Sequence, residues 1–540
     1  MENKSNETSA GSRIAKSTLA IIIFSLIGKV FGFFRESLTA YVFGAGIEMD
    51  AFSLAQGATA TISAFVTQAI ATTYIPSVQK AEMEHGKDRK NYFTNNLLFI
   101  ASLVSFVLIA LGIIFPRQIA LLTVSTKNPE TYAIVIKLIQ VGMPVVLFSS
   151  WVGVMEGYLQ HGGKFAAAGA IAIPLNLTYI IYLALFSRHV GIMGLTIASV
   201  LGILAQFLFL LPNAMKIGYR PKLVADFKDE YVRDAIVLAL PVFVSVSVND
   251  INIIVNRRLA STMGEGAASI LYYSNKLNTM IIGIFITAIT AIVFPILTKT
   301  LGSGDMKLGK KVMNASIKTV LFITVPATVG LIILARPLIE IAFVRGSFTM
   351  ADGIAATSTL RCYSLSLISI SVINVLNRIY YSIEDTKTPF YVGVTNVAIN
   401  VGLNLLVARH YGTNGLAASV SIATTIALFI SFILLRRKIG NLGTKSYIKA
   451  LIKTFMASIA MGLVALSYFP YEKLIMSFTS GGVQTLLRLI LLMLIVFIAA
   501  CVYVLCLYHL GVREVRDIAK ILKGKMEARK ELKKIKRQKQ

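Results

Sequence analysis

Apolar segments of about 20 residues recur from one end of the chain to the other, and they constrain the fold more than any other feature. A helix needs about 20 apolar residues to cross a bilayer, and about fourteen segments of this 540-residue chain qualify. Only 15% of the residues are charged, against about 25% in ordinary soluble proteins. The sequence therefore predicts an all-α polytopic membrane protein, since a β-barrel would show shorter, alternating segments.

The expected transmembrane helices fall into two sets of six and a final pair. The first set lies at 17–43, 47–78, 92–115, 131–157, 165–187 and 191–214. The second set lies at 229–262, 266–299, 311–335, 352–383, 387–408 and 412–437. The final pair lies at 448–469 and 482–510.

An internal repeat relates the two sets of six. The stretches that begin at Ser187 and Ala408 both read Arg-His-x-Gly-x-x-Gly-Leu, and the same offset of about 220 residues takes Pro116 onto Pro337. Because six is even, both halves enter the membrane from the same side, and the substrate site is expected between the two lobes. The predicted organisation is a six-helix lobe at 1–222, a six-helix lobe at 223–440, two additional helices at 441–510 and a basic cytoplasmic tail at 511–540.

The net charge of +27 lies mainly in loops and in the C-terminal tail. Alternate loops hold clusters of Lys and Arg, such as those at 80–90 and 436–438, which predicts that these loops and both termini are cytoplasmic. This placement favours contact with membrane lipids and argues against a nucleic-acid partner. Three cysteines without a CxxC or Cys/His pattern predict neither a disulfide nor a metal site.

No motif in the chain predicts catalysis. A Walker A sequence and a GxSxG sequence are both absent, and no cofactor is expected. The duplication favours a transporter over an enzyme, although an integral-membrane glycosyltransferase with dispersed acidic residues stays open as an alternative.

Charged residues inside the first apolar stretches point to a polar cavity. Lys29, Arg35, Glu36 and Asp50 lie there, and a charge at the bilayer centre costs roughly 2.5–3.5 kcal/mol on insertion scales. Lys29 and Arg35 are six residues apart and share a helix face only if the helix bends. The alternatives are that Arg35 pairs internally with Glu36 or Asp50, and that Asp50 caps the second helix.

The second half carries a matching set of polar residues. Asn249, Asn252 and Asn256 follow i, i+3, i+7 spacing, which predicts one polar stripe facing the cavity. Lys276 lies deep in the next apolar stretch, whereas Arg257 is interpreted, with its neighbour Arg258, as snorkelling to the outer surface. Lys29, Arg35 and Lys276 would make the cavity cationic and suited to an anionic, phosphate-bearing substrate.

Several stretches resemble lipid II flippases of the MurJ type, within the MATE-like multidrug/oligosaccharidyl-lipid/polysaccharide exporter superfamily. The similar stretches are GKVFGFFRESLTAYVFGAGIEMDAF, NRRLASTMGEGAASILYYSNKL, FVRGSFTMADGIAATSTLRCYSL and YYSIEDTKTPFYVGVTNVAINVGLNLL. The resemblance covers about 13–440 and implies transport of lipid II, a peptidoglycan precursor, from the inner to the outer leaflet of the bacterial cytoplasmic membrane. It also implies alternating access and a role in cell-wall synthesis and cell shape.

The resemblance implies roles for particular residues. Lys29, Arg35 and Lys276 fall on family cations that hold the substrate pyrophosphate, with Glu36 and Asp50 at the acidic positions beside them. The family's second-helix arginine has no counterpart in ATATISAFVTQAI, at 58–70. The predicted substrate-binding residues are Lys29, Arg35, Glu36, Asp50, Lys276, Asn249 and Asn252.

Some family members hold a sodium ion, and the corresponding positions here are Asn256, Asn400 and Asn404. Amides bind sodium less strongly than carboxylates, so the membrane potential is an alternative driving force, at about 2.3 kcal/mol per charge per 100 mV. The expected partners are lipid II, membrane lipids and cell-wall synthesis proteins. A flippase for another undecaprenyl-linked glycan and a MATE-type drug exporter are the alternative functions.

Overall fold

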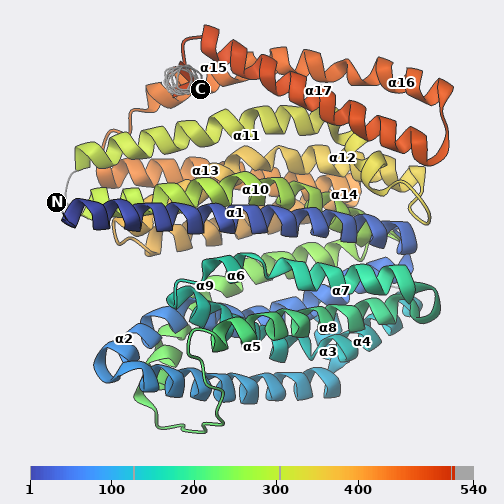
Figure 1. The fold of residues 1–540 in the computed structure, drawn as a ribbon. Helices are drawn as coiled ribbons and strands as arrows, with labels where there is room; N and C mark the ends of the chain where they lie inside the picture. The colour runs from blue at the N-terminus through green and yellow to red at the C-terminus, as the bar shows by residue number, and fades with distance from the viewer. Residues whose placement is uncertain (1, 126–127, 303–305, 513, 517–540) are drawn as a thin grey trace, which may run out of the picture. The chain divides into compact units, whose positions relative to one another are not determined.

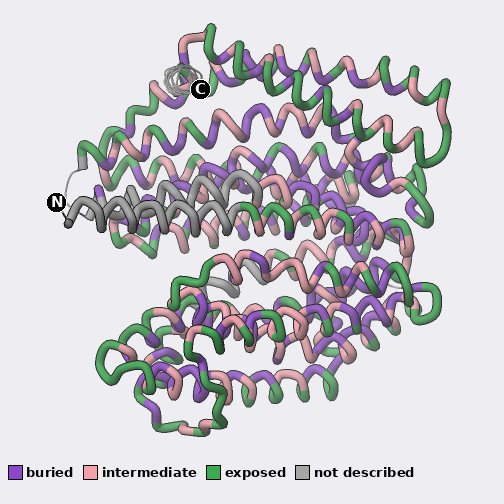
Figure 2. Tube along the Cα trace, in the orientation of Figure 1, coloured by how far each residue is buried: buried purple, intermediate pink, exposed green. Residues whose placement is uncertain are grey.

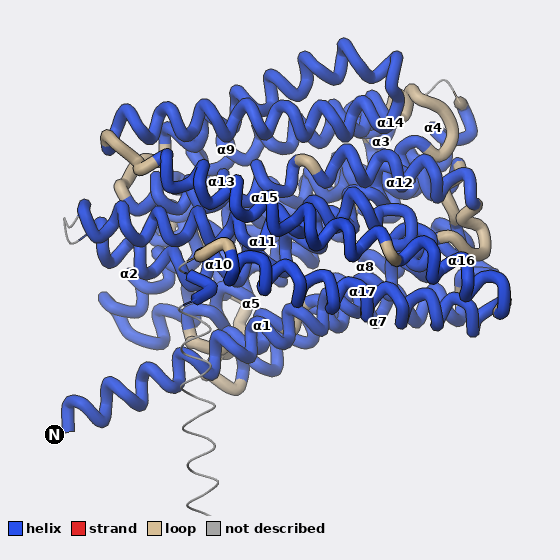
Figure 3. The backbone as a smooth tube through the Cα atoms, turned by 90° about the horizontal axis from the view of Figure 1, so that it is seen from above, coloured by secondary structure: helices blue, strands red, loops and turns tan. Residues whose placement is uncertain are grey.

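The computed structural model describes the backbone of residues 2–125, 128–302, 306–512 and 514–516. Side chains are described for those residues except 2–22, 240–250, 284–299, 301–302, 306 and 409. All regular secondary structure within these ranges is helical (Figures 1 and 3), as the sequence predicts. The side chain of Asn249 and most of the basic tail lie outside the described residues.

Seventeen helices follow one another along the described chain (Figure 1). The first nine are α1 (Glu2–Phe43), α2 (Ile47–Ile114), α3 (Pro116–Thr123), α4 (Pro129–Gly142), α5 (Val145–His161), α6 (Phe165–Gly169), α7 (Ala172–Leu185), α8 (Ser187–Met215) and α9 (Glu230–Ala260). The other eight are α10 (Ala267–Gly302), α11 (Met306–Phe343), α12 (Met350–Ser364), α13 (Ser366–Ser382), α14 (Lys387–Ile439), α15 (Thr444–Leu466), α16 (Tyr468–Phe478) and α17 (Gly481–His509).

Local sequence signals explain several helix boundaries. Asn128 caps α4, because its side-chain oxygen accepts a hydrogen bond of 2.9 Å from the Glu130 amide, and Pro129 occupies the first helical position. Asp229 caps α9 in the same way through the Tyr231 amide, also at 2.9 Å.

The repeated motif has the same backbone conformation in both copies. Gly191 in α8 has φ 61° and Gly412 in α14 has φ 55°, and both interrupt the helical geometry around them. A positive φ of this kind is readily adopted only by glycine, which explains the glycine at this place in both motifs. The two copies thus agree in structure as well as in sequence.

Nine helices of the described chain are long and apolar enough to cross a membrane, or ten if the bent pair α4 and α5 forms one span. Their outer faces carry large exposed apolar side chains, as in α17, where Phe497 is 68% exposed. Such faces are suited to lipid, and the fold is that of a multi-span helical membrane protein. The exact count of fourteen spans is consistent with these helices and stays a prediction.

The backbone contacts divide the chain into two compact units. Unit 1 comprises 1–280, 342–359 and 390–423, and unit 2 comprises the rest. The core of unit 1 includes Tyr74, Phe93 and Tyr158, and purple stretches in Figure 2 mark such buried positions. The core of unit 2 includes Val375 and Tyr380. The division into lobes at 222 and 440 stays a prediction.

Candidate functional site

A pocket of about 510 Å³ in unit 1 brings together four of the charged residues singled out above. It is lined from α1, from the α6–α7 region, from residues 276–280 of α10 and by Phe343. The charged residues that line it are Lys29, Arg35, Glu36 and Lys276.

Glycine on α1 allows the close helix contact that forms one wall. A Cβ at Gly28 would lie 2.9 Å from the Cβ of Ala172 at the start of α7. The side chain of Asn176, on α7, donates a hydrogen bond of 3.0 Å to the Gly28 carbonyl. Small residues let membrane helices approach in this way.

Lys29 and Arg35 reach the same pocket from a helix that continues without a break from Glu2 to Phe43. The lining residues of α1 include Gly28, Gly32 and Glu36, at helical spacing, and the long side chains of the two cations reach in from beside them. The two cations thus share one pocket although the helix between them is unbroken.

Glu36 is the acid at the centre of the charged network. Its carboxylate accepts a hydrogen bond from Arg35, and the Tyr272 hydroxyl donates to it at 3.3 Å. The Lys276 ammonium lies 3.9 Å from the same carboxylate. The Glu36 side chain is only 8% exposed, whereas that of Lys276 is 42% exposed. The internal Arg35–Glu36 pair considered from the sequence is present, and Lys276 joins it from α10.

Two tyrosines that the sequence reasoning missed hold the cations in place. The Arg35 guanidinium lies over the ring of Tyr179, 4.8 Å from its centroid. The Lys276 ammonium lies 5.0 Å from the ring centroid of Tyr272. Cation–π contacts of this kind contribute about 0.5–2 kcal/mol. The spacing of four residues from Tyr272 to Lys276 on one helix was the available signal for the second contact.

The pocket carries excess positive charge, because three cations face one carboxylate, leaving a net charge of +2. Arg35 is already engaged by Glu36, while Lys29 makes no hydrogen bond or ion pair with any residue that the structure describes. Excess cation in a partly enclosed pocket attracts an anion such as a phosphate group.

Asp50 belongs to α2, and its carboxylate lies elsewhere in unit 1, beside the beginning of α10. Its carboxylate accepts hydrogen bonds of 2.7 Å from the amides of Gly266 and Ser269, and one of 2.5 Å from the Ser269 hydroxyl. The alternative that Asp50 caps its own helix is wrong, because α2 begins after Gly46 and Asp50 caps a helix far along the chain. Asp50 is not among the residues that line the pocket.

The asparagines on α9 face α14 within unit 1. Asn256 donates to Asn400 at 3.2 Å and accepts from Asn404 at 2.8 Å. Asn404 also donates to Asn400 at 3.0 Å, and Asn256 donates to the Asn252 side chain at 2.9 Å. Neither Asn252 nor Asn256 lines the cationic pocket, and the corresponding prediction for Asn249 lies outside the described side chains.

The structure thus brings together the three positions of the candidate ion site, as a cluster of amides. Amide hydrogens occupy the side-chain oxygens of Asn256 and Asn400, whereas the buried Asn404 oxygen has no hydrogen-bond partner among the described residues. Among the described residues, no group of three His, Cys, Asp or Glu side chains could hold a metal ion. A hard cation prefers carboxylate oxygens, so this set fits sodium poorly.

Arg257 corrects a further interpretation. Its side chain is partly buried and donates to the Ser53 carbonyl on α2, and it lies against Gly57. The prediction that it snorkels to the outer surface is therefore wrong, whereas Arg258 is exposed and donates to the Leu121 carbonyl at 2.7 Å. Arg257 thus places a cation beside the second helix, which has none of its own in its apolar stretch at 58–70.

Solved structures resemble this fold. A structure described as lipid II flippase MurJ in an inward closed conformation matches with a TM-score of 0.73 and 24% identity, over 90% of this chain and 98% of that one. An inward-facing multidrug MATE family transporter matches with a TM-score of 0.66 and 14% identity, over 79% and 99%. At these identities the likeness concerns the fold.

The sequence comparisons are more specific. The chain is 28% identical over 471 residues to the probable lipid II flippase MurJ of Vibrio cholerae, covering 84% of this chain and 88% of that protein. It is 27% identical over 509 residues to the Haemophilus influenzae protein of the same name, covering 91% and 98%. A family model described as lipid II flippase MurJ matches residues 39–492, which is most of the chain. The chain therefore belongs to the lipid II flippase MurJ family.

Proposed function

We propose that the protein moves lipid II from the cytoplasmic to the outer leaflet of the bacterial cytoplasmic membrane. The single observation that supports this most directly is the pocket of about 510 Å³ that is lined by three cations, Lys29, Arg35 and Lys276, and by one carboxylate. Family membership supports the substrate class, and the excess positive charge of the pocket supports its assignment to the pyrophosphate.

Glu36 acts as the internal counter-ion while no substrate is bound. Its hydrogen bond with Arg35 and its proximity to Lys276 keep the cations together in the empty pocket. An entering pyrophosphate competes with Glu36 for the same cations, and Lys29 gains a partner. The exchange is favourable because Lys29, which has no ion-pair partner among the described residues, adds a charge-assisted hydrogen bond to the pyrophosphate.

Release in the other leaflet requires the opposite exchange. In an alternating-access cycle, Glu36 recovers its cations as the pyrophosphate leaves, so the carboxylate sets how tightly the substrate is held. Transport in this cycle proceeds by binding and conformational change, without covalent chemistry. Both termini face the cytoplasm in this arrangement, and cell-wall synthesis proteins are expected to work beside the protein.

Depletion of the protein tests the proposal. Cells that lack it and any redundant flippase should accumulate lipid II in the cytoplasmic leaflet and stop making peptidoglycan. Expression of the wild-type chain in a lipid II flippase depletion strain of another bacterium should restore growth. Normal outer-leaflet lipid II after depletion would contradict the function, and accumulation of a different lipid-linked glycan would point to another undecaprenyl-linked substrate.

A further inference from the structure

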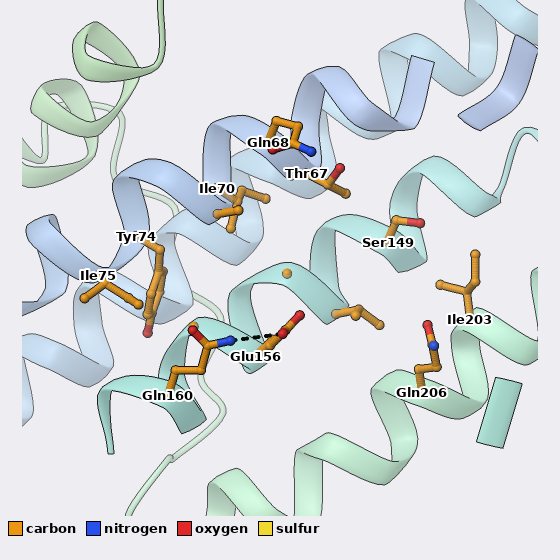
Figure 4. A pocket seen from close by; sticks show the side chains of 14 residues that line it. Thr67, Gln68, Ile70, Tyr74, Ile75, Ser149, Glu156, Gln160, Ile203 and Gln206 are labelled. Carbon is orange, nitrogen blue, oxygen red and sulfur yellow. Dashed lines mark hydrogen bonds between the residues drawn. The ribbon is translucent and has the colours of Figure 1, made fainter. Parts of the chain in front are cut away.

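A second pocket lies within unit 1, between α2, α5 and α8, with a volume of about 270 Å³ (Figure 4). Its lining combines apolar residues with six polar side chains. The polar side chains that line it are Thr67, Gln68, Ser149, Glu156, Gln160 and Gln206. Glu156 is the one charged residue among them.

Glycines on α5 line the pocket beside Glu156. Ser149, Gly153 and Glu156 follow each other at spacings of four and three residues, so they share one face of the helix. Gly157 belongs to the same face, and a Cβ there would lie 2.5 Å from the ring of Tyr74. Because α5 has no side chain at these glycines, Ile70 and Tyr74 of α2 pack closely against it.

Glu156 has an amide as its partner and no cation among the described residues. Gln160 donates a hydrogen bond of 3.0 Å to its carboxylate, as the dashed line in Figure 4 shows. Lys90 and His161 lie 3.6 and 2.5 Å from a different carboxylate, that of Glu82. A carboxylate inside a transmembrane bundle is costly and is usually paired or functional.

The surrounding groups are neutral and rich in acceptors. Gln206 donates through its amide nitrogen to the Ile171 carbonyl at 3.0 Å, which leaves its side-chain oxygen available. In Figure 4 the side chain of Gln206 extends from α8 toward α5, and Glu156 points into the space between the helices. A carboxylate with amide and hydroxyl oxygens around it suits a group that is cationic and donates several hydrogen bonds.

Ile171 connects this pocket with the cationic one. Its carbonyl accepts from Gln206, which lines the Glu156 pocket, and the same residue lines the pocket around Lys29 and Arg35. Two pockets of opposite charge are therefore neighbours in one unit. A head group that carries an anion and an ammonium group could occupy both at once.

We propose that the Glu156 pocket binds the ammonium-bearing part of the transported head group while the pyrophosphate occupies the Lys29–Arg35 pocket. This assignment rests on the proposed function. The volume of about 270 Å³ exceeds what a single ion needs and is suited to a residue-sized polar group. Glu156 would pair with the ammonium. The side-chain oxygens of Gln160 and Gln206 would accept the remaining hydrogen bonds of the ammonium.

Binding measurements on the purified full chain in nanodiscs of neutral lipid test the assignment. The probes are lipid II with a free stem-peptide amine and the same lipid after acetylation of that amine. The wild type should bind the acetylated lipid about tenfold more weakly, since an ion pair with hydrogen bonds is lost. Glu156→Gln should bind both lipids equally, at the weaker affinity. Asp88→Asn, which removes an exposed carboxylate elsewhere, should behave as the wild type.

Each other outcome overturns the assignment in a distinguishable way. Equal binding of both lipids by the wild type, or an equal acetylation effect in Glu156→Gln, removes the ammonium subsite and leaves the flippase function intact. A third outcome is that sodium chloride displaces the free-amine lipid from the wild type and potassium chloride does not. That result would assign the pocket to a free sodium ion. Failure of the wild type to bind either lipid would overturn the proposed function, and this assignment with it.

Discussion

The carboxylate of Glu36 on α1 lies 3.9 Å from the ammonium of Lys276 on α10, although 240 positions separate the two residues in the chain. The same carboxylate accepts a hydrogen bond from Arg35. One carboxylate therefore interacts with two cations from different helices. Changes at these residues test whether the pocket binds an anion.

Charge reversal at Arg35 should abolish function. Arg35→Glu would give the pocket two carboxylates against two cations, which removes the excess positive charge that attracts a pyrophosphate. We expect no growth in the complementation assay and at least about a hundredfold weaker lipid II binding. Arg35→Lys should retain partial activity, because the charge stays and the bidentate geometry is lost.

The matched control for this reversal is Arg117→Glu, at an exposed arginine outside the pocket. It should insert normally and complement fully. Equal loss of function in both variants would show that charge reversal harms the protein generally, and would contradict the specific role of Arg35.

Neutralisation of Glu36 should separate binding from transport. Glu36→Gln raises the net charge of the pocket to +3 and keeps the shape of the side chain. We expect lipid II to bind several-fold more tightly and to be released more slowly, because the internal competitor for the cations is gone. Binding in nanodiscs and flipping rates in vesicles measure the two effects. Weaker binding together with slower flipping would contradict the counter-ion role.

Loss of the cap at Asp50 should lower the stability of the protein more than it weakens substrate binding. Asp50→Ala removes three hydrogen bonds at the start of α10, and the loss of a helix cap typically costs about 0.5–2 kcal/mol. Asp50→Asn should restore part of this stability, because its amide oxygen still accepts. Thermal unfolding in detergent and lipid II binding of the folded fraction distinguish the two effects. Unchanged stability with lost binding would instead make Asp50 a substrate ligand.

The asparagine cluster predicts transport that does not depend on sodium. Asn256, Asn400 and Asn404 are neutral and bond to one another, so exchange of sodium for potassium should leave flipping rates unchanged. The double change Asn256→Asp with Asn404→Asp supplies two carboxylates of the kind that hard cations prefer. That variant should gain stabilisation by sodium. Strong sodium dependence of the wild type would contradict the prediction.

A buried ion network in unit 2 should hold α16 and α17 to α11. The Arg488 side chain, which is 12% exposed, donates to Glu340 on α11 and to Glu472 on α16. Arg488→Met leaves Glu472 buried without a cation among the described residues, while Glu340 keeps its ion pair with Arg336 at 2.6 Å. Breaking a buried ion pair costs about 3–5 kcal/mol. We expect a marked loss of folded protein, measured by size-exclusion chromatography after heating.

The control for the network is the triple change Arg488→Met, Glu340→Gln and Glu472→Gln. It removes all three charges together, so no charge of the network stays buried alone and most of the stability should return. If the triple variant is no more stable than the single variant, Arg488 acts by packing and not by charge.

Much of the fold could be predicted from apolar length and repetition. A run of apolar residues forms a membrane helix because lipid offers no partner for backbone groups, and this reasoning needs no knowledge of neighbouring segments. The conformations of Gly191 and Gly412 agree with the repeat for the same reason, since each is set by local geometry. Lys29, Arg35 and Lys276 were recognisable because a charge in an apolar run is costly wherever it lies.

Tertiary packing decided which of these polar groups meet. Asp50 and Ser269 are 219 positions apart, and nothing near either residue indicates that one caps the helix of the other. The contact of Arg257 with α2 depends likewise on the approach of distant helices. The same holds for the polar residues around Glu156. The physical reason is that hydropathy reports the cost of burying a group, whereas its partner is chosen by the three-dimensional approach of helices, which side-chain shape and glycine contacts control.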